Sequence, residues 1–316
     1  MTSSRYAFAT LLAALACGCA TTQTAPSAPG APPAAASRTM QQILDASTPA
    51  DWRALDPAHT LLMELDDRRR IVIELAPRLA PEHVANIRTL AADGFWNGLS
   101  INRSQDGFVV QWGDPAEDDA KRRPLGKAKG KLPAEAEVRG TPELAKAWTR
   151  LPDPDGWAPE VGFVDGFYAA RDPARNTYWP AHCYGMVGAG RDIALDSSTG
   201  AELYVVIGQS PRQLDRNITT VGRVVQGMEW LSTIPRGTGP LGFFEKPEQR
   251  VPIRSVRLMS DVPAAERIEL EAMRTDTPLF AELVEARRNR RDDFYKVPAG
   301  HIDLCNVPLP VRAVKR

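Results

Sequence analysis

The sequence predicts a mostly β protein in which a closed antiparallel barrel is capped by helices. Three observations support this class. Short apolar runs punctuated by turn residues recur from Thr60 to about Ser260, helical spacing is confined to a few stretches, and no internal repeat is visible. Many strands with few helices suit a closed barrel, because closure removes the unpaired edges of a sheet.

The first predicted elements of the barrel are a hairpin and a helix. From residue 60, TLLMELDDRRRIVIEL holds two apolar runs separated by a charged turn, which is typical of an antiparallel hairpin. In the APRLAPEHVANIRTLAADGFW that follows, Val84, Ile87 and Leu90 recur at helical spacing, and Gly94 marks a helix end. A further strand region is expected in INRSQDGFVVQWGDP, residues 101–115.

Residues 115–182 change character and are expected to be an insertion. AEDDAKRRPLGKAKGKLP is charged and punctuated by glycine and proline, and we interpret its basic run as a solvated loop rather than a contact for acidic lipids. Strand patterns resume in YGMVGAGRD, AELYVVIG, ITTVGRVVQGMEWLSTI and VPIRSVRLMS. Residues 261–316 interleave charged and apolar residues at helical spacing. We therefore predict a main domain at 41–260 and a C-terminal helical extension at 261–316.

The N-terminus has the pattern of a secretory leader followed by a tether. In MTSSRYAFATLLAALACGCATTQ an early arginine precedes an apolar stretch that is shorter than the roughly 20 residues of a permanent membrane helix. The small residues before Cys19 resemble the lipobox of bacterial lipoproteins, which predicts a leader at 1–19 and lipidation at Cys19. Cys17 is a rival site, and an ordinary cleaved leader is the alternative. Residues 20–40 are predicted to be a disordered Pro/Ala-rich tether, and the location to be the bacterial cell envelope, periplasmic or anchored to the outer membrane.

Charge and cysteine content narrow the range of partners. Lys plus Arg and Asp plus Glu both number 39, so no global field attracts nucleic acid, and membrane contact is expected only through the lipid anchor. Cys183 and Cys305 remain in the body, where an oxidising compartment would permit a disulfide; two free buried thiols are the alternative. No Cys/His spacing suggests a metal, and no cofactor is expected. The sequence leaves the oligomeric state and the client proteins open.

Three blocks of the sequence resemble the cyclophilin family of peptidyl-prolyl cis-trans isomerases. IVIELAPRLAPEHVANIRTLAADGFWNGLSINR is similar to the family's strand, its AP-x-x-V-x-N-F helix and the loop that leads to F-H-R. INRSQDGFVVQWGD is similar, without a gap, to F-H-R-x-x-x-G-F-x-x-Q-G-G-D. GAELYVVIGQSPRQLDRNITTVGRVVQGMEWL is similar to G-S-Q-F-F-I followed by L-D and F-G-x-V-x-x-G-M. Apart from the insertion, the resemblance covers Thr60 to Ser260.

The resemblance implies an isomerase acting on X-Pro bonds, with Arg103, Phe108 and Gln111 at the catalytic positions; together with the leader, it predicts exported proteins as the substrates. The arginine would stabilise the twisted amide, the phenylalanine would form the floor of an apolar proline pocket, and the glutamine would bind the substrate backbone. A guanidinium suits this chemistry, because the amide must twist through a barrier of about 18 to 20 kcal/mol and its nitrogen becomes basic as conjugation is lost. The implied substrate-binding positions are Tyr204, Leu214, Glu202, Gly190 and Arg191.

Several pocket positions depart from the family pattern. The departures are Asn102, Trp112, Ala201, Glu202, Tyr204, Gln213 and Ile218. Losing polar partners at Glu202 and Ile218 would leave the substrate backbone less well held, while Tyr204 can still line an apolar pocket. Two functions therefore stand. One is an isomerase of proline-containing polypeptides, and the other is a catalytically weak proline-peptide-binding module or scaffold of the envelope.

Overall fold

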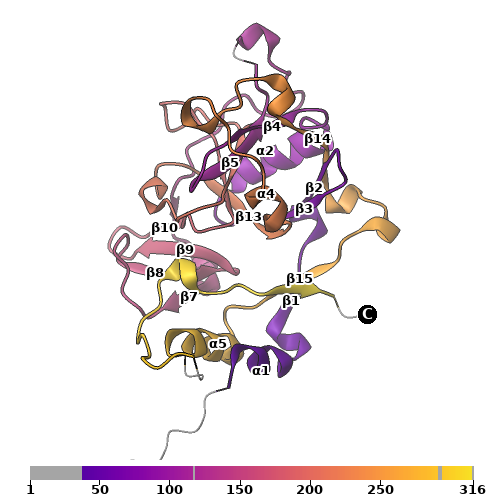
Figure 1. The fold of residues 1–316 in the computed structure, drawn as a ribbon. Helices are drawn as coiled ribbons and strands as arrows, with labels where there is room; N and C mark the ends of the chain where they lie inside the picture. The colour runs from indigo at the N-terminus through magenta and orange to yellow at the C-terminus, as the bar shows by residue number, and fades with distance from the viewer. Residues whose placement is uncertain (1–37, 117, 291–293, 315–316) are drawn as a thin grey trace, which may run out of the picture. The chain divides into compact units, whose positions relative to one another are not determined.

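The strands of residues 38–316 are arranged in three sheets. The computed structural model describes these residues except 117, 291–293 and 315–316, so the leader, Cys17, Cys19 and most of the tether lie outside the described residues. Its strands form a closed eight-stranded barrel, a five-stranded sheet and a three-stranded sheet (Figure 1). Within the described residues, no helix combines the length and the apolar character that a membrane crossing needs.

The barrel is antiparallel throughout, with strand order β11-β12-β5-β4-β14-β2-β3-β13. Leu61 and Met63 of β2 enter the main core inside the barrel, whereas Leu62 between them packs in a separate apolar cluster outside. Burial on both faces explains why the apolar run of β2 does not alternate with polar residues. The barrel strands are β2 (Thr60–Leu65), β3 (Arg70–Leu75), β4 (Ser100–Ser104), β5 (Val109–Gly113), β11 (Met186–Ala189), β12 (Leu203–Val206), β13 (Thr220–Gln226) and β14 (Val251–Leu258).

Two helices accompany the barrel, α2 (Pro81–Ala92) and α4 (Met228–Ser232). The helix predicted from its 3.6-residue spacing is α2, whose Val84, Ile87 and Leu90 join the main core. Gly94, with φ of +67°, follows its last turn. The stretch ITTVGRVVQGMEWLSTI, predicted as strand, is only partly so, because Gly227 adopts φ of +93° after β13 and α4 begins there.

The insertion contains a sheet of its own, antiparallel in the order β6-β10-β9-β8-β7. Its buried Trp179 and Phe163 belong to a second core cluster, in which the ring of Phe163 meets that of Phe280 at 5.1 Å between centroids. The sheet is therefore packed rather than loop-like. Its elements are β6 (Val138–Arg139), α3 (Pro142–Ala147), β7 (Trp148–Leu151), β8 (Glu160–Val164), β9 (Phe167–Asp172) and β10 (Thr177–Pro180).

The described residues of the C-terminal extension form one α-helix, α5 (Pro278–Arg288), and two strands, β15 (Leu270–Met273) and β16 (Val311–Ala313), rather than helices alone. The segment before α5 follows a two-residue period, because Leu270 and Ala272 are buried in one cluster and Glu271 lies between them. β15 also pairs with β1 (Trp52–Ala54). Residues from α1 (Met40–Asp45) to β1 thus associate with the extension, and the barrel begins only at β2.

A disulfide joins Cys183, just after the insertion, to Cys305 in the C-terminal segment. Cys183 is fully buried in the second core cluster, against which Cys305 packs. The bond therefore fastens the extension to the insertion. Short 3-10 helices complete the structure: η1 (Pro49–Asp51), η2 (Pro57–His59), η3 (Asp119–Lys121), η4 (Arg212–Leu214), η5 (Pro240–Gly242), η6 (Pro247–Gln249), η7 (Met259–Asp261), η8 (Ala264–Glu266) and η9 (Leu304–Asn306).

Candidate functional site

The outer face of three neighbouring barrel strands carries the candidate site. The register places Arg103 of β4 opposite Gln111 of β5, and Gln111 opposite Tyr204 of β12. Directly opposed residues share a face of the sheet, so the three side chains form one row. The sequence predicted these residues for one site, and the strand order brings them together.

A bulge in β4 turns Arg103 outward. Ile101 pairs with Trp112, and both are buried in the main core, but the register shifts before Arg103 pairs with Gln111. Because side chains alternate along a strand, Arg103 would share the inward face of Ile101 if Asn102 did not add one residue. The bulge thus converts a core-facing position into a site position.

Hydrogen bonds hold the Arg103 guanidinium in place. Its Nη1 donates to Oε1 of Gln111 at 3.0 Å, its Nη2 donates to Oε1 of Gln105, and its Nε donates to the carbonyl of Leu241 at 2.8 Å. Burial lowers the pKa of Arg103 below its ordinary value, yet a guanidinium stays charged at neutral pH. The site therefore has a fixed, half-buried cation.

Two aromatic rings lie against this cation. The Arg103 Cζ is 5.7 Å from the ring centroid of Phe108 and 5.3 Å from that of Phe243. Both separations are within the range of cation–π attraction, which favours a guanidinium lying near the rings. Phe108 therefore lies at the boundary between the cation and the apolar part of the site.

The apolar part is a small cluster outside the barrel core. Val109, Tyr204 and Val206 are buried there, and the half-buried Phe108 and Ile218 pack against them. Their backbone elements are the neighbouring strands β5 and β12 and the turn that follows η4. An apolar surface beside a fixed hydrogen-bond donor can hold a small aliphatic ring next to a polar bond.

Glu202 extends the row beyond Gln111. The Gln111 Nε2 donates to Oε2 of Glu202 at 3.5 Å, and the amide of Gly190 donates to the Glu202 carbonyl at 2.8 Å. Burial raises the pKa of the Glu202 carboxyl from 4.5 to about 7; the negative charge of Asp114 adds to this increase, and the hydrogen bond from Gln111 opposes it. The carboxyl therefore exchanges its proton near neutral pH.

Replacing Glu202 with glutamine is expected to remove a pH-dependent loss of stability. Because the folded-state pKa lies above the unfolded value, this group favours folding most below about pH 4.5, and its contribution is lost as pH rises through about 7. The variant should gain stability relative to the wild type by about 2 kcal/mol between pH 5 and pH 8. Urea unfolding at both pH values measures this difference.

Asp196 provides a control for the Glu202 variant. Its carboxyl lies in an exposed loop, and a hydrogen bond from Lys131 lowers its pKa, so it stays charged across the same pH interval. The Asp196→Asn variant should therefore show the same difference from the wild type at pH 5 and at pH 8. A Glu202→Gln variant that behaves like Asp196→Asn would contradict the proposed titration.

Two other predicted residues, Arg191 and Leu214, lie outside the three strands that carry the Arg103 row. The side chain of Arg191 donates to the carbonyls of Asn217 and Ile193, each at 2.8 Å, so it braces its own loop rather than joining the Arg103 row. Leu214 ends η4, and its carbonyl accepts from the amide of Ile218 at 3.1 Å. Leu214 therefore fixes the turn that carries Ile218 to the apolar cluster.

The sequence did not predict that the loop of Leu241 and Phe243 contacts Arg103. Leu241 is separated from Arg103 by 138 positions and contributes its backbone carbonyl, for which no side-chain signal exists. Phe243 forms an isolated bridge with Arg103 and could have been suspected only as an apolar residue in a glycine-rich loop. Among the residues that the structure describes, no group of three or more His, Cys, Asp or Glu side chains is placed to hold a metal ion.

Comparisons with known proteins identify a family and relatives for the barrel. Residues 60–258 match the family model described as cyclophilin type peptidyl-prolyl cis-trans isomerase/CLD. A probable peptidyl-prolyl cis-trans isomerase of Brucella suis is 36% identical over 105 residues, which cover 30% of this chain and 53% of the relative. Peptidyl-prolyl cis-trans isomerase B of Bacillus subtilis is 47% identical over 51 residues, 16% of this chain and 36% of the relative.

A solved structure extends the likeness of fold to most of the chain. The crystal structure of cyclophilin AquaCyp293 from Hirschia baltica superposes with a TM-score of 0.66 at 24% identity, covering 88% of this chain and 99% of that one. The match to the Brucella relative spans only about half of that relative's length. The family model, in contrast, covers the whole barrel from β2 to β14. The chain therefore belongs to the cyclophilin-type peptidyl-prolyl cis-trans isomerase family.

Proposed function

We propose that this protein is a peptidyl-prolyl cis-trans isomerase. The observation that carries the proposal is the Arg103 guanidinium, which is fixed by three hydrogen bonds beside the apolar cluster of Val109, Tyr204 and Val206. Twisting an X-Pro amide breaks no covalent bond, so the reaction requires an apolar seat for the proline ring and a donor aimed at the amide. Both requirements are met by residues of one sheet face.

The roles of Arg103 and Gln111 in the reaction follow from their hydrogen-bond donors and acceptors. A guanidinium has five N–H donors, of which three bond to Leu241, Gln111 and Gln105; the other two have no partner among the described residues and can donate to the substrate. In the twisted state the proline nitrogen has lost its conjugation and can accept from Arg103. The Gln111 amide is free to bind the substrate backbone by giving up its long 3.5 Å contact with Glu202.

Exchange NMR on a short Ala-Pro peptide tests this function directly. Catalytic amounts of the protein from residue 38 onward should bring the cis and trans signals into exchange far faster than the slow uncatalysed reaction of tens to hundreds of seconds. A folded protein that shifts the peptide signals without accelerating exchange would contradict the isomerase proposal.

That second outcome would indicate a proline-peptide-binding module. The changed pocket residues favour this alternative, because Ile218 packs against the apolar cluster as a hydrocarbon and Gln213 is exposed to solvent. Neither residue supplies the polar or aromatic group that the family pattern has at its position. In such a module the insertion and the C-terminal extension would provide further partner surfaces.

We propose an envelope location and exported polypeptides as substrates. The leader-like sequence at 1–19 supports export, and the Cys183–Cys305 disulfide in the body suits an oxidising compartment. Slow X-Pro isomerisation limits the folding of many exported chains, so such an enzyme would act on them there.

In cells fed radiolabelled palmitate, label should be incorporated into the wild type and the Cys17→Ser variant but not into Cys19→Ser. Equal labelling of both variants would contradict Cys19 as the lipidation site.

A further inference from the structure

His182 contacts the pocket residue Tyr204 but has no role in the proposed reaction. The Tyr204 hydroxyl lies 2.9 Å from Nε2 of His182, and the two rings are nearly parallel, with 11° between their planes. Both side chains are buried, with 5% of Tyr204 and 1% of His182 exposed. A Cβ on Gly188 would lie 2.2 Å from the Tyr204 ring, so a glycine is needed where the ring crosses β11.

Asp215 fixes the orientation of the histidine. Its Oδ1 lies 3.0 Å from Nδ1 of His182 and accepts from the His182 backbone amide at 2.9 Å. Because a carboxylate only accepts, Nδ1 carries a proton, and in the neutral imidazole Nε2 is then the acceptor for the Tyr204 hydroxyl. Thr220 Oγ1 is also 3.3 Å from this Nε2. The Tyr204 hydroxyl is thus in contact with a histidine whose tautomer Asp215 determines.

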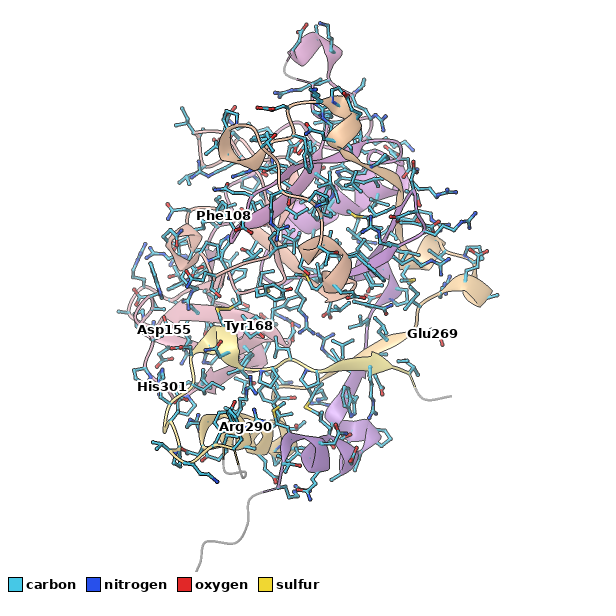
Figure 2. All side chains as sticks on the ribbon, in the orientation of Figure 1. Phe108, Asp155, Tyr168, Glu269, Arg290 and His301 are labelled. Atoms are coloured by element: carbon cyan, nitrogen blue, oxygen red, sulfur yellow. A yellow bond between two sulfur atoms is a disulfide. The ribbon has the colours of Figure 1, made fainter. Side chains whose placement is uncertain are left out.

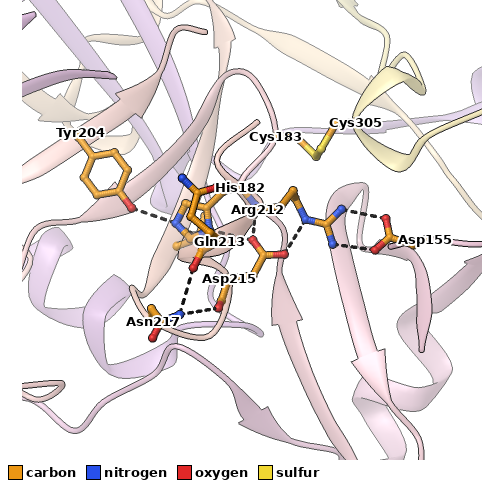
Figure 3. A network of polar contacts seen from close by, with 10 residues as sticks. Asp155, His182, Cys183, Tyr204, Arg212, Gln213, Asp215, Asn217 and Cys305 are labelled. Carbon is orange, nitrogen blue, oxygen red and sulfur yellow. Dashed lines mark hydrogen bonds and ion pairs between the residues drawn. A yellow bond between two sulfur atoms is a disulfide. The ribbon is translucent and has the colours of Figure 1, made fainter. Parts of the chain in front are cut away.

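The chain of contacts continues into the insertion (Figure 3). Arg212 donates from Nε to Oδ2 of Asp215 at 2.6 Å, and from both Nη atoms to the Asp155 carboxylate at 3.0 and 3.2 Å. The side chains of Arg212, Asp215 and Asp155 are 5%, 7% and 8% exposed. Asp155 lies between β7 and β8 of the insertion sheet, whereas Phe108 lies at the barrel (Figure 2).

Burying three charged side chains costs desolvation energy, which apolar packing in the same place would avoid. A fork-to-fork Arg212–Asp155 contact gives directional placement in return, because two parallel N–H donors fix both position and angle. This placement constrains the Tyr204 ring of the candidate pocket wall, through Asp215 and His182.

We propose that Asp155 and His182 are positioning residues for the proline pocket, so that the insertion sheet sets the wall formed by Tyr204. The inference rests on the proposed function for its kinetic test. The network should affect substrate binding equally in the ground state and in the twisted state, because it supports the apolar cluster and makes no contact with the amide. Loosening it should therefore raise KM and leave kcat nearly unchanged.

The test is a double-mutant cycle on the protein from residue 38 onward, with the Ala-Pro peptide as substrate. Asp155→Asn and Tyr204→Phe should each raise KM by about fivefold, the scale of one lost hydrogen bond. Because both act through the tyrosine hydroxyl, the double variant should be no worse than either single one. Effects that multiply in the double variant would overturn the inference.

Asp153 provides a matched control in the same loop. It is similarly buried, with 6% of its side chain exposed, but its partners are Arg288 of α5 and His301 instead of Arg212. Asp153→Asn should lower stability without changing KM. A rise of KM equal to that of Asp155→Asn would mean that the loop acts only as general support, and it would also overturn the inference.

The same variants separate this inference from the proposed function. If the wild type binds the peptide but does not isomerise it, the isomerase proposal fails, and the wall is then tested by the peptide Kd from NMR titration. Asp155→Asn and Tyr204→Phe should weaken that Kd by the same factor, and Asp153→Asn should not. An unchanged Kd in all three would refute the positioning role regardless of catalysis.

Discussion

Replacing Arg103 with alanine should lower kcat/KM for an Ala-Pro peptide by about 10²- to 10³-fold, the usual effect of removing one preorganised donor. Its guanidinium is held by Gln111, Gln105 and the Leu241 carbonyl, so it is already placed before the amide nitrogen becomes basic. Because this interaction strengthens only as conjugation is lost, peptide Kd should change by less than about threefold. Exchange NMR gives the rates, and titration of the same peptide gives Kd.

Two further variants make this result specific to the arginine. Arg103→Lys keeps the charge but loses the planar fork, so its kcat/KM should lie between those of wild type and alanine variant. Arg70→Ala removes an exposed barrel arginine whose partner is Glu64 on the neighbouring strand, and it should leave kcat/KM unchanged. If Arg103→Ala instead weakens peptide binding and kcat/KM by the same factor, the arginine binds the ground state as well as the twisted state. That result would favour the peptide-binding module.

The sequence predicts the Arg103, Phe108 and Gln111 set through the likeness of INRSQDGFVVQWGD to the cyclophilin pattern, and Arg103 and Gln111 lie side by side because β4 and β5 are adjacent strands of one hairpin. In such a hairpin, linear spacing translates directly into cross-strand pairing, and Arg103 does pair with Gln111. The outward turn of Arg103 could not be predicted, since it depends on the bulge at Asn102. A bulge changes the face of every later residue without changing the composition of the strand.

Contacts between distant segments account for most of what the sequence did not predict. The Leu241 carbonyl lies 138 positions from Arg103, and Asp155, within the insertion, lies 57 positions from Arg212. The C-terminal extension illustrates a second difficulty. Alternating charged and apolar residues around Leu270 satisfy a helical and a strand period over so short a stretch, and pairing with β1 and β16 decides in favour of strand.

Removing the disulfide should give the largest loss of stability among the variants considered. Cys183 and Cys305 are separated by 122 positions, so the bond restricts a long loop of the unfolded chain. Replacing both with alanine should lower the free energy of unfolding by about 3 to 5 kcal/mol. Alanine is preferred to serine because Cys183 is fully buried in an apolar cluster, where an unpaired hydroxyl would add its own cost. Urea unfolding measures the change.

Reductant supplies the matched control for the alanine pair. Wild type should lose a similar free energy of unfolding in dithiothreitol, whereas the double alanine variant should not respond. Equal stability of oxidised and reduced wild type would refute the prediction.

The bond also constrains the pocket, because Cys183 directly follows His182, whose backbone amide and ring both contact Asp215. Reduction should therefore raise KM for the Ala-Pro peptide in the same direction as Asp155→Asn. The C-terminal extension and the insertion would then act on the proline pocket through one histidine.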